Sequence, residues 1–230
     1  MNFIKNPFTK NKAEPVDLAP VWKELQEGNF DRVIELASEH TTSKAKETVK
    51  ESLKLIGLSY FHKELPEKAL PYFKNAAKIT PEVNDWFNVS TSATLANEID
   101  VGREALNEAI KLQSESGHSQ EPSIPYMKLY YACALRDVSE FRLAFDQIEE
   151  LRPIYEQLKI TDTTFLHIRG VPFLSHTVET AIDIFKGLGD SVNALEWLKQ
   201  FSYKLDEDGQ KYIAEVSANF TTNKALKSDS

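Results

Sequence analysis

Apolar residues recur at helical spacing in two neighbouring runs between Leu53 and Pro81. The first run carries its apolar face at Leu53, Ile56, Gly57 and Tyr60, and the second at Ala69, Phe73, Ala76 and Ala77. Pro66 lies in the polar segment between them, where it suits the first turn of a helix and not a helix interior. Small residues at Gly57 and Ala69 allow two helices to approach closely. The stretch is therefore predicted to fold as a helical hairpin.

Paired apolar runs of the same kind cover most of the chain. The other predicted hairpins span residues 17–40, 84–112, 125–158 and 178–201. One small residue marks the second helix of each hairpin, and these positions are separated by 36, 36, 39 and 50 residues: Val33, Ala69, Ala105, Ala144 and Ala194. The two longest intervals contain segments 113–123 and 161–175, whose Gly and Pro residues predict loops.

No segment of useful length alternates between apolar and polar residues as a β-strand does, so an all-α fold is expected. It comprises about five helical hairpins and a closing helix at 210–216. The helical domain is predicted to span residues 17–220. A flexible N-terminal segment at 1–16 precedes it, and a disordered tail at 221–230 follows it.

The order of small, aromatic and proline residues in the 53–81 hairpin resembles the tetratricopeptide repeat, a helix–turn–helix unit of about 34 residues. The matching positions are Leu53, Ile56, Gly57, Tyr60, Ala69, Phe73, Ala76 and Pro81. The resemblance covers about residues 17–206 and is weaker in the other hairpins. It implies a right-handed α-solenoid whose first helices line a concave surface, where members of the family usually hold partner segments.

The charge balance narrows the range of partners. The chain has 27 Lys and Arg residues against 35 Asp and Glu residues, a net charge of −8. Because phosphate backbones require a basic surface, nucleic acid is not expected as the main partner. No run approaches the ~20 apolar residues of a membrane-spanning helix, so no integral membrane segment is expected. Cys133 is the single cysteine, which excludes an intrachain disulfide and favours a reducing, cytoplasmic location.

The first twelve residues combine apolar and basic side chains. Phe3, Ile4 and Phe8 are interleaved with Lys5, Lys10 and Lys12. Two interpretations stay open for this segment. One is a frayed basic tail, and the other is a segment that docks on a membrane surface or on a protein.

Side chains that could perform catalysis or bind a metal are scattered. None of the five histidines has the spacing of a zinc site, although His167 and His176 could converge across a Gly/Pro break. Cys133 has no neighbouring base in the sequence, and a Gly-rich phosphate loop is absent. Glu179 and Asp183 share a helix face. Paired carboxylates perform acid–base chemistry only in a dry cleft, so on a helix of a repeat a solvated surface is the favoured interpretation. Neither enzymatic activity nor a metal or cofactor is expected.

The resemblance places a candidate partner-binding surface on the first helices of the hairpins. Its predicted members are Lys54, Leu58, Phe61, Phe87, Thr94, Tyr126, Tyr130, Arg136, Glu179 and Asp183. The middle of this surface is aromatic and its C-terminal end is acidic, so a protein or peptide with an apolar anchor and basic residues is the expected partner. The alternative is that the aromatic side chains pack on one another or on the 114–123 loop.

Protein–protein binding is therefore the predicted function, in a scaffold, an adaptor or a chaperone-like carrier. Two other functions remain as alternatives. One is an enzyme or a small-ligand sensor with a pocket at the irregular segment 161–176. The other is a structural subunit of a larger helical complex.

Overall fold

The computed structural model describes residues 13–117 and 120–228, and residues 221–228 by their backbone alone. Its helices are α1 (Ala19–Gln26), α2 (Phe30–Ser38), α3 (Lys46–His62), α4 (Pro66–Ala77), α5 (Val83–Leu95), α6 (Ile99–Glu115), α7 (Ile124–Asp137), α8 (Phe141–Leu158), α9 (Thr163–Ile168), α10 (Leu174–Leu188), α11 (Ser191–Ser202) and α12 (Glu207–Ser228). The described residues contain no β-strand, which confirms the predicted all-α fold.

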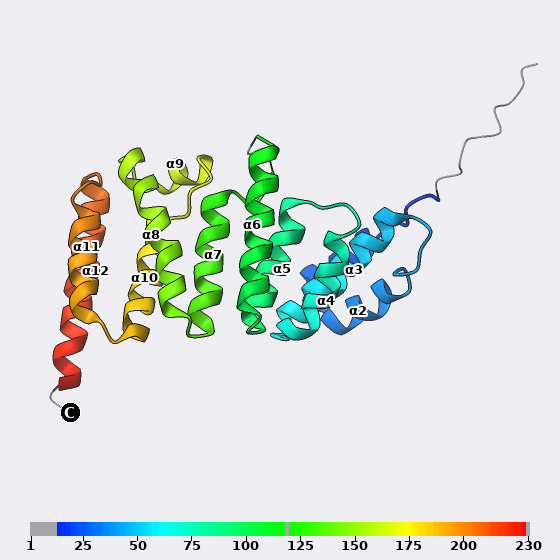
Figure 1. Ribbon diagram of the computed structural model, residues 1–230, viewed down its shortest axis with the longest axis horizontal. Helices are drawn as coiled ribbons and strands as arrows, with labels where there is room; N and C mark the ends of the chain where they lie inside the picture. Colours follow the sequence, from blue (N-terminus) through cyan, green and yellow to red (C-terminus); the bar gives the residue numbers. More distant parts are fainter. Residues whose placement is uncertain (1–12, 118–119, 229–230) are drawn as a thin grey trace, which may run out of the picture.

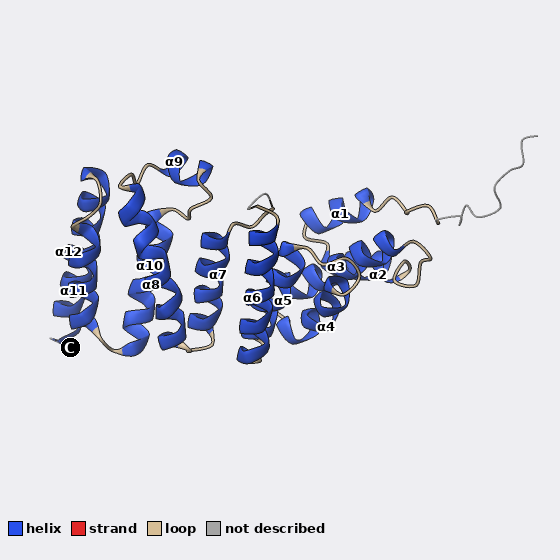
Figure 2. Cartoon of the chain, turned by 45° about the horizontal axis from the view of Figure 1, so that its top comes forward, coloured by secondary structure: helices blue, strands red, loops and turns tan. Residues whose placement is uncertain are grey.

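The helices lie side by side in one elongated array (Figure 1). Consecutive helices pack in pairs: α1 with α2, α3 with α4, α5 with α6, α7 with α8, and α10 with α11. The second helix of a pair also packs against the first helix of the next pair, as α4 does on α5 and α8 does on α10. Each hairpin is thereby stacked on its successor. The short helix α9 lies at one edge of the array, and α12 packs on α11 at its far end (Figure 2).

The predicted hairpins correspond to these pairs, with differences at two places. The irregular segment 161–175 contains the short helix α9. The closing helix predicted at 210–216 is the longer α12, which continues as helix through residues 221–228, where a disordered tail was expected. That stretch includes Lys, Ala and Leu, which have high helix propensity. Residues 1–12 of the predicted N-terminal segment and residues 229–230 lie outside the described residues.

Two glycines mark close contacts between paired helices. A Cβ atom at Gly57 would lie 2.7 Å from the ring of Phe73, which accounts for the small residue in the 53–81 hairpin. A Cβ atom at Gly102 would lie 2.1 Å from Oγ1 of Thr94 and 3.0 Å from the carbonyl oxygen of Ser90. The sequence pattern indicates the first contact and not the second. Both contacts set the distance between a first helix and its own second helix.

The irregular segment after α8 is tied into the core. The hydroxyl of Tyr155 donates to the carbonyl oxygen of Pro172 at 2.7 Å and lies 2.8 Å from Oγ1 of Thr177. Leu166 and Val171, on either side of the turn at Gly170, are buried among the same core side chains. Burial of the Tyr155 ring raises the pKa of its phenol well above the usual range. The segment 161–176 therefore contributes packing side chains to the C-terminal half of the array.

Replacing Gly102 by Ala is expected to destabilise the protein by about 1–3 kcal/mol, because the added methyl group overlaps Thr94 and the α5 backbone. Helix propensity alone predicts the opposite, a gain of about 1 kcal/mol. Urea unfolding followed by circular dichroism measures the difference. The matched control on the exposed face of α6 is Asn107→Ala, which should be neutral or slightly stabilising. A stabilised Gly102→Ala variant would contradict the close contact between α5 and α6.

Replacing Tyr155 by Phe is expected to lower stability at pH 7 by about 1–3 kcal/mol, because two buried hydrogen bonds are lost. The raised pKa favours the neutral phenol in the folded state. The contribution of the Tyr155 hydroxyl to the free energy of unfolding is therefore complete below pH ~10. Above that pH it falls by about 1.4 kcal/mol per pH unit. The parent and the variant should therefore differ less in the urea concentration at half-unfolding at pH ~10.5 than at pH 7. Tyr203→Phe, at an exposed tyrosine, is the control and should leave both midpoints unchanged.

Candidate binding groove

The first helices α3, α5 and α7 enclose an open groove of about 350 Å³. We call it the apolar groove, and it is lined by Leu58, Phe61, His62, Phe87, Asn88, Thr91, Leu95, Tyr130, Cys133, Ala134 and Asp137. Each helix contributes residues at helical spacing, for example Phe87, Thr91 and Leu95 on α5. Most of the lining side chains are apolar or aromatic, which is typical of sites that hold a ligand's apolar groups.

Aromatic rings form one wall of the apolar groove. The rings of Phe87 and Tyr130 lie 6.4 Å apart in a tilted arrangement, and Tyr126 stacks on Tyr130 at 6.3 Å. Tyr130 is 50% exposed, which is unusual for a large aromatic side chain so close to other rings. The rings support one another on one side and leave a face of Tyr130 open to solvent.

Four predicted partner-binding residues line the apolar groove: Leu58, Phe61, Phe87 and Tyr130. Tyr126 lies beside it through its contact with Tyr130. Thr94 does not belong to this surface, since it is fully buried and its hydroxyl donates to the carbonyl oxygen of Ser90 at 2.9 Å. The α5 face that holds Ser90 and Thr94 packs on Gly102 of α6. The spacing of 4 residues from Phe87 to Thr91 and again to Leu95 is the sequence signal for the α5 face that lines the groove.

Both carboxylates of the predicted acidic end have partners within the chain. Asp183 pairs with Lys186 at 2.9 Å and lies 3.8 Å from Arg136. Arg136 also donates to Asp137 at 2.8 Å. The hydroxyl of Tyr212 donates to Glu179 at 3.3 Å, and burial together with this carboxylate raises the pKa of Tyr212 to about 12. Asp183 and Glu179 are therefore already engaged within the chain.

Lys54 lies on the face of α3 that leads to the apolar groove, one turn before Leu58. Its ammonium group pairs with Glu51 at 2.9 Å, and its side chain is only 14% exposed. Cys133 lies in the groove itself, with Sγ 3.6 Å from Oγ1 of Thr180. Burial raises the pKa of the Cys133 thiol, so the neutral thiol is its form at pH 7.

A buried ion pair holds α3 and α5, two walls of the groove, together. The ammonium group of Lys50 lies 2.7 Å from Asp85, 2.9 Å from Glu82 and 2.7 Å from the carbonyl oxygen of Thr80. Burial lowers the pKa of Lys50, but the hydrogen bonds to Asp85 and Glu82 outweigh it and raise the pKa overall. Burial raises the pKa of Asp85 more than Lys50 lowers it. With three acceptors around one ammonium group, we take the pair as ionised at neutral pH.

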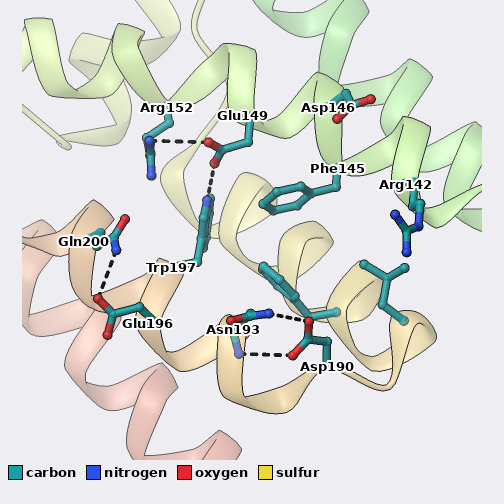
Figure 3. A pocket seen from close by; sticks show the side chains of 12 residues that line it. Arg142, Phe145, Asp146, Glu149, Arg152, Asp190, Asn193, Glu196, Trp197 and Gln200 are labelled. Atoms are coloured by element: carbon teal, nitrogen blue, oxygen red, sulfur yellow. Dashed lines mark hydrogen bonds and ion pairs between the residues drawn. The ribbon is translucent and has the colours of Figure 1, made fainter.

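A second groove lies between the second helices α8 and α11 (Figure 3). Its volume is about 700 Å³, and Phe145, Phe185 and Trp197 form an aromatic floor. The indole N–H of Trp197 donates to Glu149, which also pairs with Arg152 at 3.4 Å. Glu196 accepts from Gln200, and Asp190 caps α11 through Asn193. The walls of this groove are therefore polar and bonded to one another.

The described residues include no group of three or more His, Cys, Asp or Glu side chains placed to hold a metal ion. His167 is exposed, and the ring of His176 lies 5.6 Å from that of Phe173. None of the helices, as far as the chain is described, combines the length and apolar character needed to cross a membrane.

No protein-family model, no curated protein and no solved structure matches this chain.

Replacing Lys50 by Met is expected to destabilise the protein by about 3–5 kcal/mol, because Asp85 is left as an unpaired buried carboxylate. The double variant Lys50→Met/Asp85→Leu should recover much of that loss, since no buried charge remains. Urea unfolding of the parent, of Lys50→Met, of Asp85→Leu and of the double variant provides a double-mutant cycle. Lys46→Met, at an exposed lysine of the same helix, is the control. Additive effects in the cycle would show that Lys50 and Asp85 are not coupled.

Proposed function

We propose that the chain is a non-enzymatic protein-interaction module, in which a tetratricopeptide-like, right-handed array of hairpins holds a partner segment in the apolar groove. The observation that carries this proposal is the half-exposed Tyr130 beside Phe61 and Phe87 in an open, mostly apolar groove at the middle of the array. Leaving a large aromatic side chain in water forgoes roughly 1.5–3 kcal/mol of burial, which a bound segment recovers. Scaffold, adaptor and carrier roles all use such a groove.

The chemistry of the groove indicates the chemistry of the partner. Leu58, Phe61 and Leu95 offer apolar surface for an anchor side chain. Asn88 stands among them as a polar group that can bond a peptide backbone, whereas the hydroxyl of Thr91 already donates to the carbonyl oxygen of Phe87 at 3.2 Å. The carboxylates of Asp183, Glu179 and Glu51 are engaged with Lys186, Tyr212 and Lys54. Basic residues of the partner are therefore expected to lie toward Glu47, at the N-terminal end of α3.

Two alternative functions have less support. An enzyme or a small-ligand sensor at 161–176 would need an open pocket there, whereas Leu166, Val171 and Tyr155 are packed in the core. A structural subunit of a larger helical complex would present apolar faces at the ends of the array. The outer side chains of α12 include Lys211, Glu215 and Asn219, which are polar and exposed. A cytoplasmic location is part of the proposal, because a groove with a free thiol suits a reducing compartment.

The proposal is tested by selecting peptides from a displayed random library on the intact protein and measuring their affinity for groove variants. Tyr130→Ser is expected to weaken a selected peptide roughly 10- to 100-fold, as removal of an aromatic anchor does. Tyr203→Ser removes a tyrosine that is 84% exposed and outside the apolar groove, so it serves as the matched control. Unchanged melting temperatures confirm that both variants are folded. Equal affinity for the parent and Tyr130→Ser would contradict the proposed function.

A further inference from the structure

The groove between α8 and α11, which we call the α8–α11 groove, has parallel walls (Figure 3). Glu149 of α8 accepts from Trp197, and seven positions later in both segments Glu156 accepts from Lys204 at 2.7 Å. The constant offset shows that the two helices run in the same direction. Both pack on α10 and hardly on each other, and Phe185 of α10 lines the space between them. The groove is therefore a channel with a helix as its floor.

The α8–α11 groove continues past its main hollow. A second hollow of about 390 Å³ shares Arg152, Glu196 and Gln200 with it. On α8 the lining extends from Arg142 to Glu156, about 21 Å at 1.5 Å per residue. A helix of four turns has this length, and a channel between two parallel helices is a surface on which a further helix packs. The all-helical array offers no free strand edge for an extended segment to pair with along the described chain.

Large apolar side chains stay exposed along the α11 side of this groove. Leu188 is 37% exposed, Val192 73% and Tyr203 84%, and these are three of the eight large apolar side chains that the described structure leaves exposed. Leu188 and Tyr203 line the two hollows. Val192 and Tyr203 are 11 positions apart, about three helical turns, so they lie on the same side of α11. A helix over the groove would cover both of its ends.

The charges at the Tyr203 end of the groove largely have partners. Arg152 lies 3.4 Å from Glu149 and 3.6 Å from Glu156, and Lys204 also pairs with Glu156. Lys199 adds one more positive charge to the lining of this end. Basic residues of an occupant therefore have no reason to lie here.

The opposite end of the groove carries an excess of negative charge. Three carboxylates line it, those of Asp146, Asp190 and Glu196, against the single guanidinium group of Arg142 that is not engaged by other carboxylates. Hydrogen bonds reach Asp190 and Glu196 from neighbouring amide groups, and no described basic side chain pairs with any of the three. Asp146 and Glu196 are exposed on the two facing helices. Lys or Arg side chains of an occupant are favoured at this end.

We propose that the α8–α11 groove docks an amphipathic helix of a partner protein, with Lys or Arg at the positions that face Asp146 and Glu196. Apolar side chains on one face of that helix cover Leu188, Val192 and Tyr203, in the manner of a helix bound in a groove. The site lies on the second helices of the hairpins. It is separate from the apolar groove and does not depend on the function proposed for that groove.

Two displayed libraries of stapled, helical 15-residue peptides serve as probes. Both have random apolar residues at positions i, i+4, i+7 and i+11. One library has Lys at the positions that flank this apolar face at one end, and the other has Glu there. Selection on the intact protein is expected to enrich peptides from the Lys library alone. Enrichment of the Glu library, equal enrichment of both, or enrichment of neither overturns the proposal.

Charge reversal tests the predicted contacts of a selected peptide. Asp146→Lys/Glu196→Lys is expected to weaken its binding roughly 10- to 100-fold at low ionic strength. The loss should be smaller in about 0.5 M NaCl, because salt screens exposed charges. Glu67→Lys/Glu104→Lys makes the same change of charge at exposed positions of α4 and α6 and is the matched control. With melting temperatures unchanged, equal affinity for the parent and Asp146→Lys/Glu196→Lys overturns the proposal.

The indole N–H signals in the NMR spectrum locate the bound peptide. The chain has three tryptophans, Trp22 on α1, Trp86 on α5 and Trp197 on the floor of the α8–α11 groove. The peptide is expected to shift the signal of Trp197, identified by its loss in Trp197→Phe, and to leave the other two in place. A shift of Trp22 or Trp86 with Trp197 unchanged overturns the proposal.

Two tyrosine variants separate this inference from the proposed function. Tyr203→Ser is expected to weaken the selected helix about fivefold or more, whereas Tyr130→Ser should leave its affinity unchanged. If Tyr130→Ser alone weakens it, the helix binds in the apolar groove, so the proposed function stands and this inference is wrong. If the protein without peptide forms a dimer that Asp146→Lys/Glu196→Lys dissociates, the α8–α11 groove binds a second copy of the chain, which also overturns the proposal.

Discussion

The buried contact of Lys50 with Asp85, Glu82 and Thr80 is the interaction on which the geometry of the array depends most. It joins the first turns of α3 to the first turn of α5, so it sets how two of the three walls of the apolar groove stand relative to each other. Apolar packing of α3 and of α5 on α4 would tolerate some sliding, whereas an ammonium group surrounded by three acceptors fixes one arrangement. One oxygen of Asp85 is buried without a hydrogen-bond partner, which already costs free energy. Loss of Lys50 would remove the ion pair of the other oxygen and raise the cost of burying this carboxylate.

Sequence alone could predict the contacts that depend on neighbouring residues. The small residue Gly57 indicates a close approach, and the structure places the ring of Phe73 against it. The aromatic middle of the groove is equally local, because Phe61, Phe87 and Tyr130 each lie on the groove-lining face of their own helix. Such features follow from helical spacing within one hairpin.

Features that depend on several helices could not be predicted in this way. Thr94 was expected on the inward face, but the rotation of α5 is set by its contact with Gly102 on the following helix. Asp183 pairs with Lys186 on its own helix, but its second cationic neighbour, Arg136, lies on another helix, 47 positions away in the chain. The groove between α8 and α11 forms where both helices pack on α10, and its aromatic floor combines Phe145, Phe185 and Trp197 from the three helices. None of these relations leaves a periodic signal in the sequence.

The position of the apolar groove within the array determines when it is lost during unfolding. Each hairpin packs only on its neighbours, so the free energy of unfolding is a sum of local contributions along the array. The end hairpins have a neighbour on one side only and therefore open first. The helices α3, α5 and α7 have other helices packed on both sides: α1 and α2 at one end, and α8 to α12 at the other. Fraying of α1 or of α12 therefore leaves the three walls in place. Amide hydrogens of α5 and α7 should exchange only through the largest opening of the molecule, which makes the groove the most persistent part of the native structure.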